Sequence, residues 1–464
     1  MVVHETLDVG VDIGKATHVA GFVSTTLLTR HQRFESCPAL SFDNSREGFR
    51  SLVDRIRTYV PLAQVYVVME VTGHFHRALL QYLQELDIPV YVIHVQKRQA
   101  GLLKTDKRDA LGLANLLFNQ LEKGIQVGDP MQAVRRLASP TRAASQLRGM
   151  VHHRTELIFE STRRQNKLIA FCDEIFPEFV QICKKPNLPS ALAVREHFPT
   201  PAAIATARLS ALQEVRIGHH PSDDKLVELQ KLASHSIGTK DPTRLRGLIF
   251  EQHQLIAELQ LIHRHLEQLE TEMAEIVQRS REGKILTSIP GIGVIPAATI
   301  IAMIGNIANF SRASQLKAYF GWAPALAQSG YTLDSARLSP RGTRQMKRMM
   351  YLVVWTAIKM DCEWSRIYGR LVPIKCSYDE RTRRYTGRGK IIGRIAGQII
   401  SVVFTLLKKD QEPLSKLPPG TEPPEPQLYD PEMHRQHRSG QYQPAHRGEK
   451  PHKLIQLPPQ SLII

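Results

Sequence analysis

Two carboxylates stand among three cations in the segment Lys-Thr-Asp-Lys-Arg-Asp, residues 104–109, just before an apolar run. If Asp106 and Asp109 lie in the first turn of a helix, their spacing of three residues places both side chains on one face. There they could share a hard divalent cation, because such ions prefer carboxylate oxygens. The same two acids could instead serve only to complement the positive end of the helix dipole. Partners elsewhere in the chain must decide between these interpretations.

Two further acids stand at the ends of predicted strands. Residues 7–13 alternate apolar residues with Asp8, Gly10 and Asp12, and this period of two is typical of a strand. Residues 65–69 form a second apolar run, which Glu70 ends. Asp12 alone is not diagnostic, since aspartate is common in turns. Glu70 needs more explanation, because a carboxylate that closes a buried strand requires a partner or a metal.

The elements that must position these acids follow the order of an RNase H-like α/β fold, a mixed sheet with helices on its faces. In that fold the first and fourth strands are neighbours and the last helix packs beside them. The four acids would therefore converge. The expected strands are 7–13, 18–23, 27–34, 65–69 and 90–93, and the expected helices begin after Asn44 or Ser45, surround residues 79–83 and span 106–121.

Length and charge indicate several domains and a polyanionic partner. The 464 residues exceed one ordinary core, and 61 Lys and Arg against 44 Asp and Glu give a net charge of +17 and a pI near 9.7. The chain shows no apolar run of membrane length and no signal-peptide pattern, which predicts a soluble cytoplasmic protein. Five scattered cysteines and isolated histidine pairs predict reduced thiols and no zinc site.

Residues 131–283, which follow a predicted catalytic domain of residues 1–130, are expected to form a helical domain. Apolar residues from Leu248 to Ile276 alternate at spacings of three and four, interrupted only by Gln252, as in a coiled-coil seam. Basic residues accompany the earlier helix predicted at 141–171. One interpretation is oligomerisation through the seam, with nucleic acid along the basic faces. The other is an intramolecular helical hairpin with solvated charges.

Residues 284–409 are predicted to form a third, mainly α-helical domain that binds nucleic acid. Its opening turn, Ser-Ile-Pro-Gly-Ile-Gly, places Gly291 and Gly293 where backbone amides could approach a phosphate, as in helix-hairpin-helix contacts; a plain helix turn is the alternative. Residues 331–409 hold 17 Lys and Arg against five Asp and Glu, with aromatic residues between them. The candidate phosphate contacts of the chain are Lys104, Lys107, Arg108, Arg341, Arg344, Lys347 and Arg348.

The last segment, residues 410–464, is predicted to be a disordered tail. It holds 11 of the 28 prolines and little apolar periodicity. Its pair His434 and His437 has no further ligands nearby in the sequence and predicts no metal site.

These motifs, in this order, resemble the DEDD-type insertion-sequence transposases. That family is similar to RuvC-like Holliday-junction resolvases at its N-terminus and includes pilin-gene DNA invertases and bridge-RNA-guided recombinases. The resemblance covers about residues 5–405. It rests on Val11-Asp12-Ile13-Gly14-Lys15, Met69-Glu70-Val71-Thr72-Gly73, the segment 104–110, the turn 288–293, and Gly321-Trp322-Ala323-Pro324 with Ser329-Gly330.

The resemblance implies an acidic tetrad of Asp12, Glu70, Asp106 and Asp109 that binds Mg²⁺, and a serine nucleophile at Ser329. Asp8 is an alternative to Asp12, and Ser335 and Ser339 are alternatives to Ser329. The family's arrangement also implies a homo-oligomer, dimer or tetramer, in which the serine domain of one subunit meets the acidic domain of another. DNA and a structured noncoding guide RNA are the implied partners.

The chemistry of these residue types agrees with strand exchange. Carboxylate-bound Mg²⁺ polarises a scissile phosphate, and a phosphoserine conserves the bond so that strands rejoin without ATP. The leading hypothesis is therefore RNA-guided, site-specific DNA strand exchange for a mobile element. Three alternatives stay open: a structure-selective junction endonuclease, a sugar-kinase or actin-like ATPase suggested by Asp12-Ile13-Gly14-Lys15, and a non-catalytic nucleic-acid-binding protein.

Overall fold

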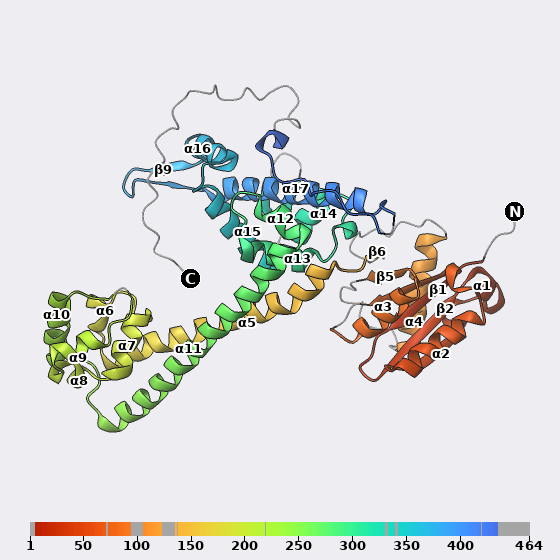
Figure 1. Cartoon of the computed structure of the whole chain (residues 1–464). Coiled ribbons are helices and arrows are strands. Elements are labelled where there is room, and N and C mark those ends of the chain that lie inside the picture. Colours follow the sequence, from red (N-terminus) through yellow and green to blue (C-terminus); the bar gives the residue numbers. More distant parts are fainter. Residues whose placement is uncertain are drawn as a thin grey trace. The chain divides into compact units, whose positions relative to one another are not determined.

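The computed structural model describes residues 5–70, 73–93, 105–122, 135–136, 138–218, 220–329, 333–338, 342–418 and 420–434, with the backbone alone at 135–136, 324–329, 333–337 and 433–434. The chain divides into two compact units (Figure 1). The first holds residues 1–140 and 306–311, and the second holds residues 141–305 and 312–464. The segments predicted as separate middle and C-terminal domains thus belong to one unit.

The first unit is built on a six-stranded mixed sheet with the order β3-β2-β1-β4-β5-β6. β1 and β2 are antiparallel, as are β2 and β3, whereas β4 runs parallel to β1 and β5 parallel to β4. This arrangement agrees with the predicted RNase H-like α/β domain. The strands are β1 Leu7–Asp12, β2 Thr17–Val23, β3 Ala39–Asp43, β4 Val65–Glu70, β5 Val90–Ile93 and β6 Arg135–Arg136.

One predicted strand is wrong. Residues 27–34 lie mostly in helix α1 (Thr25–His31) and reach the short 3-10 helix η1 (Phe34–Ser36), and the third strand is β3 instead. The reason is local: the Ser24 hydroxyl accepts a hydrogen bond from the Leu27 amide at 3.2 Å and caps the helix. The threonine-rich composition favours a strand, but this cap and the following turn prevail.

The other predicted helices of this unit are confirmed. Helix α2 (Arg46–Arg57) begins after the N-cap Ser45, and α3 (His76–Glu85) and α4 (Asp106–Leu121) follow. The α2 side chains Leu52 and Ile56 are fully buried in the same core cluster as Val9 of β1. The strands are buried at consecutive positions, and α2 is buried along one face, so both contribute to one core.

The second unit contains a long antiparallel helical hairpin of α5 (Arg142–Ile175) and α11 (Pro242–Arg279). The ion pairs between the two helices show that they are antiparallel, because residue numbers along α11 fall as those along α5 rise. Arg154 binds Glu270 at 2.7 Å, Arg164 binds Glu258 at 2.6 Å, Lys167 binds Glu251, and Glu174 binds Arg244 at 2.6 Å. Between the far ends of the two helices lie α6 (Phe179–Ile182), α7 (Pro189–His197), α8 (Pro201–Thr206), α9 (Leu209–Glu214) and α10 (Asp223–Ser234) (Figure 1).

This pairing matches the intramolecular interpretation of the seam, and the predicted oligomerising coiled coil is not confirmed. The seam residues Leu248, Leu259, Ile262 and Met273 are buried within the chain. Arg154, Arg164 and Lys167 face glutamates of α11, so these cations are already neutralised. A seam pattern reports which face of a helix is buried, and it does not report whether the partner helix belongs to the same chain.

Gln252, the polar residue that interrupts the seam, has a structural partner. Its side-chain oxygen accepts from Arg195 Nη2 at 2.7 Å, and its amide nitrogen donates to the Arg195 carbonyl at 3.0 Å. The buried Arg195 guanidinium also donates to the Leu168 carbonyl at 2.7 Å. These bonds satisfy a cation that burial would otherwise make costly.

The remainder of the second unit is mainly helical, as predicted. Its last α-helix, Gly389–Leu414, is the one helix of the described residues that is long and apolar enough to cross a membrane. However, Ile395, Ile399 and Val403 are fully buried, and the helix packs on four neighbouring helices of this region. It is thus the core helix of this region. The elements are α12 Arg281–Thr287, α13 Val294–Ile304, α14 Ala313–Tyr319, β7 Pro324–Ser329, β8 Leu333–Leu338, α15 Arg344–Ala357, α16 Glu363–Lys375, β9 Ser377–Asp379, β10 Arg384–Thr386 and α17 Gly389–Leu414, with η3 Ile307–Asn309 in the first unit.

Residues 410–434 depart from the predicted disordered tail. Asp410 lies inside α17 and binds Arg281 at 2.6 Å. The Tyr429 amide donates to the Ser288 hydroxyl at 2.9 Å, and its ring stacks on the buried Trp364 with centroids 5.3 Å apart. An aromatic anchor among prolines is enough to dock a segment that composition alone classes as disordered. Residues 435–464, including His437, lie outside the described residues.

Candidate active site

The carboxyl ends of β1 and β4 bring Asp12 and Glu70 to one edge of the sheet. The two strands are parallel neighbours, and their register pairs Val11 with Met69. Each strand ends one residue later, β1 at Asp12 and β4 at Glu70. Because neighbouring parallel strands share their carboxyl edge, these two acids lie side by side there, both half-buried.

Helix α4 carries the other two predicted acids in its first turn. Its bounds agree with the predicted helix 106–121, and the Thr105 hydroxyl accepts from the Arg108 amide at 3.3 Å as the N-cap. Asp106 is exposed and Asp109 is half-buried. Asp109 lies one turn before Leu113, which is buried, so Asp109 continues the face that α4 turns to the sheet.

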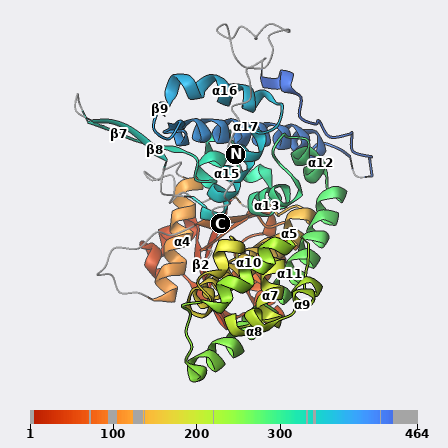
Figure 2. The ribbon, with the colours of Figure 1, turned by 90° about the vertical axis from the view of Figure 1, so that its left-hand side faces the viewer.

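Two glycines let α4 approach the sheet closely (Figure 2). Gly10 of β1 pairs with Gly21 of β2. A Cβ atom on Gly10 would stand 2.1 Å from the Ala110 carbonyl oxygen, and one on Gly21 would stand 2.7 Å from the Leu111 amide nitrogen. The α4 backbone therefore rests directly on β1 and β2. A glycine inside a predicted strand is the sequence signal for such an approach, and the predicted site did not use it.

The direction of α4 places its acids at the carboxyl edge. At its C-terminal end the Glu122 carboxylate accepts from the Thr6 hydroxyl, just before β1, at 2.7 Å. The helix therefore runs antiparallel to β1. Its first turn lies toward Asp12, which shares a strand face with Gly10 because the two are two residues apart.

Asp12 and Glu70 thus end neighbouring strands at one edge, and the first turn of α4, which carries Asp106 and Asp109, lies toward that edge. Within the described ranges, no three carboxylate, imidazole or thiol side chains already form a group that could hold a metal ion. The four predicted donors, Asp12, Glu70, Asp106 and Asp109, are all carboxylates. Hard cations such as Mg²⁺ prefer such oxygen ligands, so the donor set fits a divalent cation of this class.

Asp8, the alternative ligand, lies away from this edge. It precedes Asp12 by four residues, about 13 Å along a strand. Its side chain is fully buried, and neither carboxylate oxygen has a hydrogen-bond partner among the residues that the structure describes. Burial raises the pKa of the Asp8 carboxyl to about 7, and the Glu122 carboxylate adds to this increase. Asp8 is therefore a buried acid beneath the far end of α4.

Asp8 should make the stability of the protein depend on pH. Its pKa rises on folding from 3.8 to about 7, so between these values the folded state keeps a proton that the unfolded state has lost. The free energy of unfolding therefore falls as the pH rises through this window, by at most about 4 kcal/mol, and levels off above it. Asp8→Asn cannot ionise and should lack this decline.

Calorimetric unfolding of both proteins from about pH 4 to about pH 8 measures the effect. The melting temperature of Asp8→Asn relative to wild type should increase up to about pH 7 and then stay constant. Asp54→Asn, at an exposed position of α2, is the control and should show no such trend. A difference between Asp8→Asn and wild type that is independent of pH would contradict the prediction.

The turn after Asp12 has its own internal bonds. The Gly14 amide donates to Nδ1 of the buried His18 at 3.2 Å, and the Asn44 side chain donates to the Lys15 carbonyl at 3.1 Å. The Gly14 amide is thus engaged within the turn, and a phosphate loop would need it free. This geometry disfavours the ATPase alternative.

The cations predicted beside the acids differ in their surroundings. Lys107 and Arg108 are exposed, and Arg108 Nη2 lies 3.9 Å from the Glu35 carboxylate. Lys104 lies outside the described residues. Such an exposed pair is weak and leaves Arg108 able to exchange Glu35 for a phosphate.

Of the two glycines in the predicted phosphate-binding turn, the structure explains one by packing. Gly291 lies between α12 and α13 with φ of 89°, and a Cβ there would stand 2.7 Å from the Val353 carbonyl oxygen. Gly291 is buried against α15, so conformation and close approach both require glycine. Gly293 is exposed and caps α13. The plain-turn interpretation accounts for Gly291, and Gly293 remains a candidate contact.

Ser329 is the last residue of β7, which forms a β-hairpin with β8. It pairs with Leu333 of β8, and the alternative Ser335 pairs with Ala327. Gly330 and Ser339 lie outside the described residues, as does the cation Arg341. The other candidate contacts begin α15 just after this hairpin: Arg344 and Arg348 are exposed, and Lys347 is half-buried.

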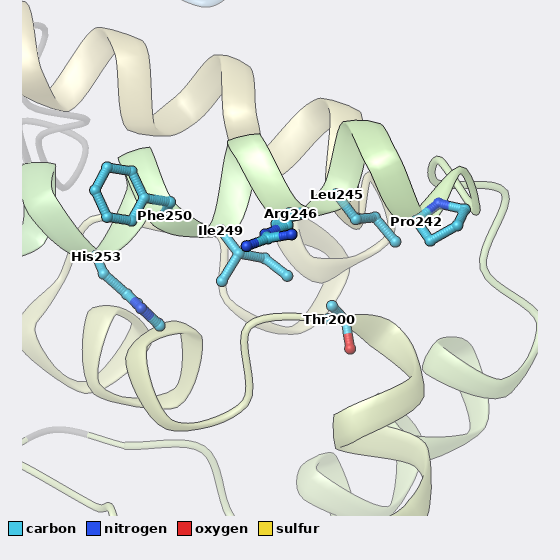
Figure 3. Close-up of a pocket in the computed structure, with 7 residues that line it drawn as sticks. All are labelled: Thr200, Pro242, Leu245, Arg246, Ile249, Phe250 and His253. Atoms are coloured by element: carbon cyan, nitrogen blue, oxygen red, sulfur yellow. The ribbon is translucent and has the colours of Figure 1, made fainter.

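An apolar pocket beside α11 is not a rival site. It is lined by Leu245, Ile249 and Phe250 with Thr200, Pro242, Arg246 and His253 (Figure 3). None of these residues is a carboxylate, and the one imidazole bonds through Nε2 to the Glu196 carbonyl at 3.0 Å. The pocket lacks the groups that phosphoryl transfer requires.

Two transposase family models match the chain in order. A DEDD-type transposase model covers residues 9–177, and a model described as Transposase IS116/IS110/IS902 family covers residues 283–369. The first includes all four acids, and the second includes Ser329.

Curated relatives agree with these matches. The chain is 25% identical to the 43.6 kDa protein of insertion element IS110 from Streptomyces coelicolor over 332 residues, which is 69% of this chain and 75% of the relative. It is 23% identical to the 42 kDa protein of insertion element IS900 from Mycobacterium paratuberculosis over 411 residues, 86% and 95% of the two chains. It is 26% identical to the pilin gene-inverting protein of Moraxella bovis over 165 residues, 34% and 46% of the two chains.

Proposed function

Because the chain belongs to the DEDD-type insertion-sequence transposases of the IS116/IS110/IS902 family, we propose that it exchanges DNA strands by means of an acidic Mg²⁺ site and a serine nucleophile. The acids are Asp12, Glu70, Asp106 and Asp109, and the nucleophile is Ser329. The observation that carries the acidic half is the shared edge of β1 and β4, with the first turn of α4 lying toward it. Sequence position alone supports the serine.

The four acids would hold the divalent cation at the edge where the scissile phosphate reacts. Bound Mg²⁺ supplies a Lewis acid for the scissile phosphate. Asp12 and Glu70 are fixed by their strands, whereas Asp106 and Asp109 move with α4. The close packing of α4 on Gly10 and Gly21 therefore determines the distance between the acids of the strands and the acids of α4.

The serine conserves the energy of the broken bond. The Ser329 hydroxyl oxygen attacks phosphorus, the bond to one strand oxygen breaks, and that strand leaves with the proton. A hydroxyl of another strand then attacks the phosphoserine and releases the serine. One phosphoester replaces another in each step, so no ATP is needed.

Two partners complete the proposal. The resemblance to the family supports a homo-oligomer that combines the acidic site of one subunit with the serine of another. The resemblance to bridge-RNA-guided recombinases supports a structured noncoding RNA from the element as the guide.

The test is strand exchange between two plasmids, one with the element ends and one with the target. With wild-type protein, Mg²⁺ and RNA transcribed from the element flank, rejoined junctions should form, and EDTA should abolish them. Junctions that form equally without RNA would remove the guide from the proposal. Nicked product without any rejoining would favour the structure-selective endonuclease.

A further inference from the structure

A small hairpin between α16 and α17 lies beyond both matched family segments, which end at residues 177 and 369. β9 and β10 contribute three residues each, joined by the turn 380–383 (Figure 1). Asp379 holds the turn: its carboxylate accepts from the Thr382 hydroxyl at 2.8 Å and from the Arg381 amide at 3.0 Å. These bonds lower the pKa of Asp379, so its charge already serves the turn.

The hairpin exposes aromatic rings that no core requires. Tyr378 and Tyr385 are directly paired across the strands, with ring centroids 5.0 Å apart at 61°. Tyr378 is 53% exposed. Two-stranded hairpins of this length gain little from their own contacts. The pair of exposed Tyr378 and half-buried Tyr385 therefore needs another explanation.

Cations surround this pair. Arg381, Arg383 and Arg384 are exposed, as are Lys375 and Lys390 at the base. None of these five forms an ion pair with another residue of the described ranges. The acids between residues 375 and 390 are Asp379 and Glu380, against six cations. The tip of the hairpin is thus strongly basic.

Further aromatic residues continue from the base of the hairpin. Arg388, two residues after β10, places its guanidinium 5.9 Å from the ring centroid of Trp355 on α15. The ring centroid of Trp355 lies 6.0 Å from that of Tyr351, and Tyr351 is 43% exposed. Aromatic rings and cations, some exposed and some half-buried, therefore continue from the hairpin to α15.

We propose that this surface, residues 375–390 together with Tyr351 and Trp355, binds unpaired nucleotides by base stacking and phosphate contacts. The inference rests on the proposed function and names a contact within it. Aromatic rings stack on the faces of bases, and these faces are accessible only where strands are unpaired. The arginines match the backbone phosphates that accompany those bases. An opened DNA strand and a single-stranded part of an RNA present this same chemistry.

The experiment measures fluorescence anisotropy of the full-length protein with labelled oligothymidylate, oligouridylate of equal length and a matched DNA duplex, in EDTA. Tyr378→Ala with Tyr385→Ala should lower the affinity for the single strands by about tenfold or more and leave the duplex affinity unchanged. Replacing Arg381, Arg383 and Arg384 by Gln should reduce the slope of the logarithm of single-strand affinity against the logarithm of salt concentration by about two. Phe159→Ala and Arg279→Gln, which change exposed side chains of the hairpin of α5 and α11, should change neither quantity.

Unchanged single-strand affinity in the tyrosine variant, with wild-type circular dichroism, would overturn the inference. An equal loss on the duplex would overturn it as well. So would retained single-strand binding with lost binding to phosphatidylserine vesicles, which would identify a lipid surface instead. A larger loss for oligothymidylate assigns the opened DNA strand, and a larger loss for oligouridylate assigns RNA. Because EDTA prevents catalysis, the result is independent of whether Ser329 and the acids perform strand exchange.

Discussion

Replacing Glu70 by glutamine is expected to lower strand exchange by about a thousandfold or more. Glu70 ends β4 beside Asp12, where β1 and β4 share an edge. A carboxamide keeps the shape but loses the charge that holds the cation. The cation contributes several kcal/mol to the transition state, and about 1.4 kcal/mol corresponds to a factor of ten in rate. Asp12→Asn and Asp109→Asn should behave alike.

Quantitative amplification of the rejoined junctions measures this loss, and gel-shift titration checks that DNA binding survives. Asp54→Asn is the matched control, since Asp54 is an exposed acid of the same unit on α2. Its rate should stay within about twofold of wild type. If Glu70→Gln and Asp12→Asn both retained exchange, the edge of β1 and β4 would not be the catalytic site.

Replacing Ser329 by alanine is expected to abolish the covalent protein–DNA intermediate completely. The methyl group of alanine has no oxygen that could attack phosphorus, so the first step of the reaction cannot occur. A substrate nicked next to the exchange site traps the intermediate of the wild-type protein, which then appears as a slower band in denaturing gels. Mass spectrometry of the trapped peptide should place the phosphate on Ser329.

Ser335→Ala is the matched control for this experiment. Ser335 lies on the partner strand opposite Ala327, away from the end of β7. It should form the adduct at the wild-type level. An adduct that persists in Ser329→Ala but disappears in Ser335→Ala would move the nucleophile to β8, and no adduct in any form would favour an endonuclease.

The two experiments separate the halves of the proposed site. Removal of an acid should prevent both adduct formation and exchange, because the scissile phosphate is no longer activated. Removal of the serine should leave cation-dependent DNA binding in place. Loss in both cases through misfolding is recognised by a lowered melting temperature.

Much of the acidic site could be predicted from the sequence because local chemistry determines it. Alternation over residues 7–13 indicates β1, an apolar run that Glu70 ends indicates β4, and the Thr105 cap starts α4 at Asp106. Strand period and helix capping are properties of neighbouring residues, so they survive without knowledge of the fold. The same reasoning predicts a strand at residues 27–34, where the Ser24 cap starts helix α1 instead.

Other properties depend on partners that are distant in the chain. Whether Asp8 or Asp12 could serve the site was open in the sequence, since both share one strand face. The fold decides it, because α4 covers Asp8 and its first turn lies toward Asp12. The seam of α11 likewise showed an apolar face without showing that α5 covers it. Tyr429 docks because Trp364 is there to receive it.

The sequence by itself determined which residues are the candidates for the chemistry: the acids at element ends, the family motifs and the basic C-terminal segment. Only the tertiary structure decided which of them meet. Sheet order places β1 beside β4, and the Gly10–Gly21 pair lets the backbone of α4, whose first turn carries Asp106 and Asp109, approach the sheet closely. The physical reason is that periodicity records which face of an element is buried, whereas the identity of the covering element depends on the packing of the whole domain.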